Sequence, residues 1–150
     1  MDFSTFHLPR WRELPMIPLY MDQVLYVLND TFAPLTVEKD PVATPSAINS
    51  YVKAKLLEPP SNKKYMREHL AKLVILYLLK RVLLMAEIDA LLKQLFAHDS
   101  EAAYDLFCEA FEACLRGEKQ AECPALLEAA LQACCGKLNV EWLLAGSVKK

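Results

Sequence analysis

Apolar and polar positions follow a helical period through most of this chain, most clearly between Thr44 and Lys55. The apolar positions recur at i, i+3, i+4 spacing and comprise Ile48, Tyr51, Val52 and Leu56. The opposite face carries Ser46, Asn49, Ser50 and Lys53. Thr44 supplies a capping oxygen, and Pro45 suits the first helical position because its missing N–H is not needed there. The pattern predicts a short amphipathic helix that begins at Thr44.

The same periodicity predicts five more helices, so we expect an all-α fold. Their approximate ranges are 20–32, 66–85, 87–96, 100–115 and 124–135. The segment 66–85 is apolar on nearly every side, which predicts that it is the central, buried helix. Its inward positions are Leu70, Leu73, Val74, Tyr77 and Leu78.

The two ends of the chain show weaker patterns. Residues 1–18 contain three prolines, which predicts an extended arm that wraps on the core. The apolar anchors of this arm are Phe3, Phe6, Leu8, Trp11 and Leu14. At the other end, Trp142, Leu143 and Leu144 predict a short apolar hook.

A polar turn separates the helix at Thr44 from the long apolar helix. Pro59 and Pro60 end the first helix, and Ser61, Asn62, Lys63 and Lys64 follow. This order of parts is typical of a winged helix-turn-helix, with the turn as the tip of the wing. We therefore predict a winged helix-turn-helix core with additional C-terminal helices. The predicted division is an arm (1–18), the winged domain (19–98) and an acidic helical extension (99–150).

Charge separates along the chain although the formal net charge is only −2. Residues 41–81 hold eight basic and two acidic side chains, whereas residues 82–141 hold four basic and eleven acidic ones. Such asymmetry is expected of a module that meets a polyanion beside one that does not. We therefore expect double-stranded DNA as the partner and transcription regulation as the function.

The candidate DNA-binding residues lie on the polar face of the predicted helix and around the turn. They are Thr44, Ser46, Asn49, Ser50, Lys53, Lys63, Lys64 and Arg67. Serine and asparagine can reach base edges, with asparagine suited to adenine, whereas lysine and arginine suit phosphates. The alternative is a solvated helix face, because any surface helix shows water a polar stripe.

Residues 48–92 resemble the DNA-binding domain of mercury-resistance-type (MerR-like) regulators. That family has a helix with a tyrosine-containing end that runs into Leu-Leu-x-Pro, similar to Ile48, Tyr51, Leu56, Leu57 and Pro59. It continues through a wing to a tyrosine and a leucine-rich helix, similar to Tyr65, Leu70, Leu73 and Ile75, and then to a Glu-Ile pair, similar to Glu87 and Ile88. The resemblance implies a winged helix-turn-helix that binds DNA.

The chain departs from that family at two positions and shares short motifs with another. Asn49 stands where the MerR-like proteins carry Arg, and Lys55 where they carry Gly. The motifs LPRW (8–11), LYMDQV (19–24), INSYVK (48–53) and KKY (63–65) resemble a family of short bacterial proteins catalogued as a domain of unknown function. That second family implies no biochemical activity.

Composition and spacing argue against an enzyme, a cofactor or a bound metal. The three glycines are too few and too dispersed for a Gly-rich phosphate loop. His7, His69 and His98 lie in different segments, without the spacing of a metal or nucleophile constellation. The five cysteines lack a Cys-x-x-Cys pair, so we expect packing rather than metal ligation or disulfides. They are Cys108, Cys114, Cys123, Cys134 and Cys135.

Neither a membrane span nor a secretion signal is evident. The most apolar run, 70–85, contains Lys72, Lys80 and Arg81 and is shorter than the roughly 20 apolar residues that a span needs. The first residues lack the basic start and unbroken apolar stretch of a secretion signal. We expect a cytoplasmic protein without a membrane partner.

A protein-interaction module that keeps the fold without binding nucleic acid is the alternative function. We expect a homodimer, since regulators commonly read two half-sites by symmetry. The helices from Ser100 to Cys135 are the expected seam, with Phe107 and Phe111 among its apolar positions. Alternatively, these side chains complete the core of a single chain.

Overall fold

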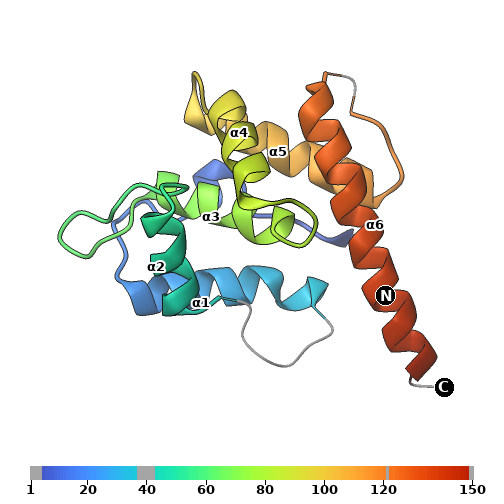
Figure 1. Ribbon diagram of the computed structural model, residues 1–150, viewed down its shortest axis with the longest axis horizontal. Helices are drawn as coiled ribbons and strands as arrows, with labels where there is room; N and C mark the ends of the chain where they lie inside the picture. Colours follow the sequence, from blue (N-terminus) through green and yellow to red (C-terminus); the bar gives the residue numbers. More distant parts are fainter. Residues whose placement is uncertain (1–4, 37–42, 121, 149–150) are drawn as a thin grey trace.

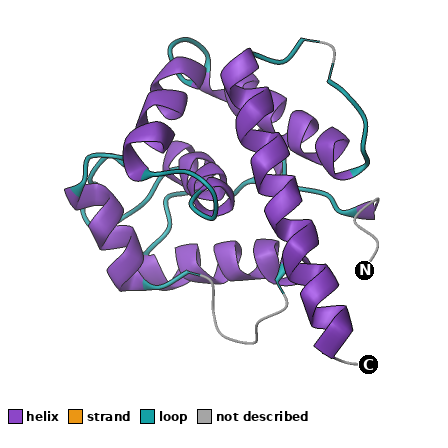
Figure 2. Cartoon of the chain, turned by 45° about the vertical axis from the view of Figure 1, so that its right-hand side comes forward, coloured by secondary structure: helices purple, strands orange, loops and turns teal. Residues whose placement is uncertain are grey.

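The computed structural model describes residues 5–36, 43–120 and 122–148 (Figure 1). Six α-helices occur in these ranges: α1 (Met21–Phe32), α2 (Pro45–Lys53), α3 (Arg67–Leu79), α4 (Met85–Leu95), α5 (Ser100–Leu115) and α6 (Ala125–Val148). Two short 3₁₀ turns, η2 (Trp11–Glu13) and η3 (Ala33–Leu35), complete the regular structure, and β-pairing in the described residues is limited to isolated bridges (Figure 2). The predicted all-α class is confirmed.

The central helix is α3, which contacts α1, α4, α5 and α6. Its residues from Leu70 to Leu79 are buried apart from Lys72, as the encircling apolar pattern predicts. Its predicted end at Met85 is wrong, because α3 ends at Leu79 and α4 begins at Met85. The break has a local cause: the Glu87 carboxylate accepts a hydrogen bond of 2.7 Å from the Leu84 N–H, and this bond caps a new helix.

The last helix is longer than predicted. Instead of ending near Cys135 and leaving an apolar hook, α6 continues as one helix to Val148, with Trp142 on its final turns. Gly136 weakens a helix only modestly, and tertiary contacts hold the segment beyond it. The Trp142 indole N–H donates to the Leu35 carbonyl at 3.2 Å, and Arg81 binds the Glu141 carboxylate at 2.6 Å.

The predicted N-terminal arm is present over residues 5–18. Leu8 and Leu14 are buried, and Phe6 and Trp11 pack partly buried against the core, whereas Phe3 lies outside the described residues. The described part of the arm contains no α-helix and includes the 3₁₀ turn η2, because its prolines disfavour a longer helix.

Polar contacts fix this arm to α5. The Glu112 carboxylate accepts from the Leu8 N–H at 2.8 Å and from the Arg10 guanidinium at 2.6 and 3.1 Å. The Tyr104 hydroxyl donates to the Pro9 carbonyl at 2.7 Å, and the Trp11 N–H donates to Asp105 at 2.8 Å. Burial alone raises the pKa of Glu112, but the hydrogen bonds from Arg10 and Leu8 outweigh it and hold the pKa below its ordinary value.

Helix α5 carries the two phenylalanines, Phe107 and Phe111, that were expected in a dimer interface. Phe107 and Phe111 are fully buried within the chain, and their rings stack with centroids 6.3 Å apart. They complete the core of the single chain, so they are not free to form the expected dimer seam. No described helix combines the length and the apolar character that crossing a membrane requires.

Candidate nucleic-acid interface

Helix α2 begins as the sequence predicts. The Thr44 hydroxyl accepts the Ala47 N–H at 3.3 Å, and Pro45 occupies the first helical position. The segment before it is held by α1, because the Asn29 side chain bonds both the N–H and the carbonyl of Ala43, at 2.9 and 3.3 Å. This double contact fixes where α2 starts relative to α1.

The two faces of α2 have different environments. Ile48 and Tyr51 are buried, and the Tyr51 ring meets the Tyr77 ring edge-on with centroids 5.7 Å apart. Burial raises the pKa of Tyr77, so its hydroxyl stays neutral at physiological pH. On the other face all four predicted contact residues are exposed: Ser46, Asn49, Ser50 and Lys53. The Ser50 hydroxyl donates back to the Ser46 carbonyl at 3.0 Å.

A left-handed residue ends α2. Lys55 has a φ of 64°, its N–H donates to the Val52 carbonyl at 3.0 Å, and the Leu56 N–H donates to the Tyr51 carbonyl at 3.0 Å. These two bonds form a Schellman motif, in which the left-handed position is most often glycine. This is the position where the MerR-like proteins carry Gly, and here a lysine adopts that conformation.

The predicted polar turn is a two-residue hairpin. Ser61 and Lys64 exchange both backbone hydrogen bonds, at 3.1 and 2.9 Å, and the intervening Asn62 and Lys63 have φ values of 51° and 63°. Positive φ at both central residues is the requirement of a type I′ turn. A further antiparallel bridge, between Leu19 and Tyr65, anchors the base of the hairpin with bonds of 2.9 and 2.7 Å.

Lys63 and Lys64 differ in their surroundings. Lys63 is exposed at the hairpin tip, whereas the Lys64 ammonium lies 5.3 Å from the centroid of the Tyr20 ring. Lys64 is also partly buried.

Arg67 is placed differently from the other predicted contact residues. Its guanidinium donates to the Leu14 carbonyl at 3.1 Å and lies 5.8 Å from the centroid of the Trp11 ring. These contacts join α3 to the N-terminal arm. They do not place Arg67 beside the polar face of α2.

The basic residues of segment 41–81 fall into two groups. Four of them lie on α3 or just after it and contact partners away from α2 and the hairpin: Arg67 at the arm, Lys72 with Glu68 and Phe96, Lys80 over the Tyr77 ring, and Arg81 with Glu141. The other four lie on the end of α2 and on the hairpin, and we call them the lysine cluster: Lys53, Lys55, Lys63 and Lys64. In the described part of the chain, none of the four forms an ion pair.

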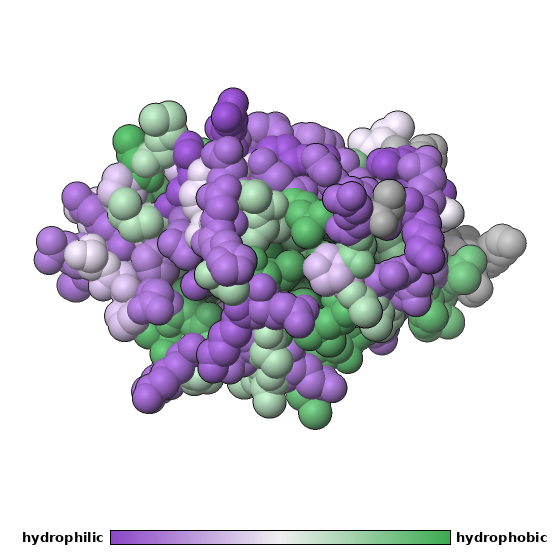
Figure 3. All heavy atoms as spheres, turned by 90° about the horizontal axis from the view of Figure 1, so that it is seen from above, coloured by the Kyte–Doolittle hydropathy of each residue, from purple (hydrophilic) through white to green (hydrophobic). Residues whose placement is uncertain are grey.

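Sequence reasoning missed Lys55 as a member of this group, although its departure from glycine was a signal. Figure 1 shows the hairpin segment projecting at one end of the molecule, next to α2. Seen from above, that end is mostly hydrophilic (Figure 3).

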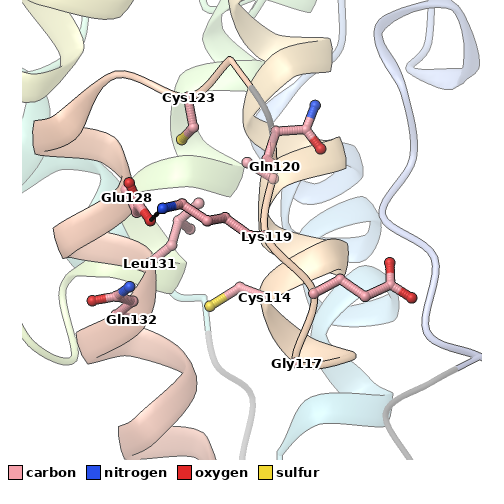
Figure 4. A pocket seen from close by; sticks show the side chains of 10 residues that line it. Cys114, Gly117, Lys119, Gln120, Cys123, Glu128, Leu131 and Gln132 are labelled. Atoms are coloured by element: carbon pink, nitrogen blue, oxygen red, sulfur yellow. Dashed lines mark ion pairs between the residues drawn. The ribbon is translucent and has the colours of Figure 1, made fainter.

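Elsewhere, a pocket of about 340 Å³ lies between the end of α5 and the start of α6. Cys114 and Cys123 point into it, and Lys119 and Glu128 approach to 3.9 Å across it (Figure 4). All five cysteines are free thiols, and burial raises the pKa of Cys108 and of Cys134 to about 12, so both stay protonated. Within the described residues no three His, Cys, Asp or Glu side chains are grouped to hold a metal ion.

The histidines have local roles. His69 caps α3, since its Nδ1 accepts the Met66 N–H at 2.9 Å, and its Nε2 lies 3.1 Å from the Glu58 carbonyl. His7 Nε2 lies 2.8 Å from the Glu13 carboxylate. His98 is exposed.

The fold and this surface define a small all-helical protein with a polar, lysine-bearing end. Residues 9–111 match the profile of a family described as Domain of unknown function (DUF1836), and the chain belongs to that family. The match spans both predicted domain boundaries, 18/19 and 98/99, and that division stays a prediction. Searches of curated proteins and of solved structures gave no significant match.

Proposed function

We propose that this protein binds double-stranded DNA and regulates transcription, with a MerR-like winged helix-turn-helix as its DNA-binding core. In this proposal α2 is the recognition helix and the hairpin is the wing. The observation that carries it is the lysine cluster beside the exposed polar face of α2, whose side chains have no acidic partner among the described residues. Unpaired cations next to exposed Ser and Asn side chains are the chemistry that phosphates and base edges require.

The dimensions of α2 suit this role. With its side chains an α-helix is about 10–12 Å across, so α2 fits the major groove, which is about 12 Å wide. With the helix in the groove, Asn49 and Ser46 would read base edges, and Lys53, Lys63 and Lys64 would hold phosphates on either side. Arg67 acts indirectly here, by fixing the start of α3 to the arm.

A protein-interaction module is the second candidate, and one observation favours it. Val140 and Leu144 lie one helical turn apart on α6 and are 48% and 62% exposed. Exposed apolar residues at this spacing suit a partner helix, including that of a second copy. The DNA-binding experiment below separates the two candidates, and light scattering at micromolar concentration tests whether the partner of α6 is a second copy.

The experiment distinguishes a residue that contacts base edges from residues that bind backbone phosphates. Asn49→Ala should lower affinity for a sequence selected from a random duplex library by roughly 1–3 kcal/mol and leave non-specific binding nearly intact. Lys63→Ala with Lys64→Ala should weaken binding to every duplex and reduce the slope of log affinity against log salt by about 2.

The chain offers matched controls for both variants. Asn139 is exposed on α6, so Asn139→Ala should change neither measurement. Lys93→Ala with Lys137→Ala removes two exposed lysines from α4 and α6 and should leave the salt slope unchanged. If the wild type enriches no sequence and binds no duplex at low salt, the regulator proposal is rejected and the interaction module takes its place.

A further inference from the structure

Backbone strain is concentrated next to the proposed interface. In the described residues, three residues other than glycine have positive φ, and all three lie between the end of α2 and the tip of the hairpin: Lys55 (64°), Asn62 (51°) and Lys63 (63°). Left-handed backbone disfavours residues with a Cβ, less so for asparagine. Two of the three are lysines, which lack the local hydrogen bonding that helps asparagine in this conformation.

The end of α5 provides an internal comparison. There, Gly117 has a φ of 75°, the Glu118 N–H donates to the Ala113 carbonyl at 2.8 Å, and the Gly117 N–H donates to the Cys114 carbonyl at 3.0 Å. This is the same Schellman motif that ends α2, with glycine at the position that Lys55 occupies. The chain therefore uses glycine for this geometry in one place and a lysine in the other.

Among the described residues, no side-chain partner accounts for a lysine at position 55. Lys55 is exposed, and in the described part of the chain its ammonium group forms neither an ion pair nor a contact with an aromatic ring. A cation near a helix C-terminus gains a small favourable interaction with the helix dipole. Lys53 already provides a cation in the last turn of α2.

We infer that Lys55 is a further DNA-contacting residue, one that binds a backbone phosphate between the contacts of α2 and those of the hairpin. The inference rests on the proposed function and adds a residue to its site. The left-handed turn at Lys55 follows the end of α2 at Lys53 and precedes the hairpin, so Lys55 comes between Lys53 and the hairpin lysines in the sequence. Strained conformations persist at sites where they serve a ligand. A lysine at this position lowers folding stability and raises affinity for DNA.

The decisive variant is Lys55→Gly, since it should move stability and binding in opposite directions. The melting temperature should rise by about 2–4 °C, because glycine relieves the left-handed strain. Affinity for a labelled mixed-sequence duplex of about 30 base pairs at low salt should fall by up to about fivefold, and the salt slope should fall by about 0.9. Lys55→Asn, which tolerates the same backbone, should weaken binding equally with a smaller thermal shift.

Two controls separate strain from charge. Gly117→Lys introduces a lysine into the equivalent motif of α5, where an added Cβ meets nothing within 4 Å, so it should lower the melting temperature by about 2–4 °C without altering the affinity for DNA. Lys137→Gln removes an exposed charge from α6 and should change neither quantity.

The outcomes distinguish this inference from the proposed function. If the wild type binds the duplex and Lys55→Gly binds with the same affinity and salt slope, Lys55 lies outside the interface, while the proposed function stands. If the wild type binds no duplex at low salt, both are rejected. Weaker binding with an unchanged salt slope also overturns the phosphate assignment, because a lost phosphate contact must reduce counterion release.

Discussion

The contact between the arm and α5 and the segment from α2 to the hairpin use polar side chains in opposite ways. At the arm, Glu112, Arg10 and Tyr104 find partners inside the chain, at 2.6 to 3.1 Å. At the end of α2, Asn49 and the lysine cluster are exposed or half-exposed and form no ion pair among the described residues. Polar groups with partners inside the chain stabilise the fold. Exposed polar groups without such partners, two of which lie on left-handed backbone, are available to a ligand.

This difference changes how the charge asymmetry of the sequence is interpreted. Eight basic residues between positions 41 and 81 suggest one polyanion-binding surface. In the structure, the four on α3 or just after it bind carboxylates, carbonyls or aromatic rings away from α2 and the hairpin. The surface that remains is smaller and is confined to α2 and the hairpin, so a count of charges overstates the site by about a factor of two.

Removing the Glu112 carboxylate is the strongest test of whether the contact between the arm and α5 stabilises the fold. Glu112→Ala leaves the Arg10 guanidinium and the Leu8 N–H without their carboxylate partner, so we expect the free energy of unfolding to fall by about 3 kcal/mol. Urea denaturation followed by circular dichroism measures it. Glu109→Ala, an exposed carboxylate on the same helix, is the control and should stay within about 0.5 kcal/mol of the wild type. Equal effects of the two variants would show that the arm contact contributes little.

The same contact predicts a dependence of stability on pH. Because the folded-state pKa of Glu112 is below its ordinary value of 4.5, its contribution is fully present above that value. It is lost as the pH falls through the lower folded-state pKa, so stability should decrease below about pH 4. Thermal melts from pH 6 to pH 3 should show a steeper loss for the wild type than for Glu112→Gln. Parallel curves would contradict this assignment.

Replacing Arg67 should lower the free energy of unfolding less than replacing Glu112. Comparison with Lys63 separates a role in folding from a role in binding. We expect Arg67→Ala to lower the free energy of unfolding by about 1–2 kcal/mol, since it removes the contacts with the Leu14 carbonyl and the Trp11 ring. Lys63→Ala should change it by less than about 0.5 kcal/mol. In DNA titrations of folded protein the order should reverse, with Lys63→Ala causing the larger loss. A larger binding defect for Arg67→Ala would place Arg67 at the interface.

Local signals in the sequence predicted much of this fold. The cap at Thr44, the limits of α5 at Ser100 and Leu115, and the buried face of α3 all follow from residues close together in the chain. The end of α3 was not predicted although its cause is also local, because the apolar pattern continues past it to Met85; the length of α6 depends on contacts far away in the sequence. A carboxylate three residues ahead restarts the helix at Leu84, and distant partners at Leu35 and Arg81 hold the last turns of α6.

The candidate site shows the same limit. The exposed face of α2 was predictable because a helical period separates its two faces. The role of Arg67 was not, since its partners Leu14 and Trp11 lie more than fifty residues away in the sequence. The left-handed conformation of Lys55 was indicated only by the resemblance, which has glycine at that position, because a lysine itself gives no local signal for positive φ.

The bond between the Leu8 N–H and Glu112 spans 104 residues, so it has a consequence for the order in which the chain folds. During synthesis the arm is made first, but its binding surface on α5 emerges from the ribosome only after most of the other helices. Contacts of such sequence separation form late, because the loop between them must first be closed. The Leu8 N–H therefore cannot reach its Glu112 partner until α5 has been synthesised.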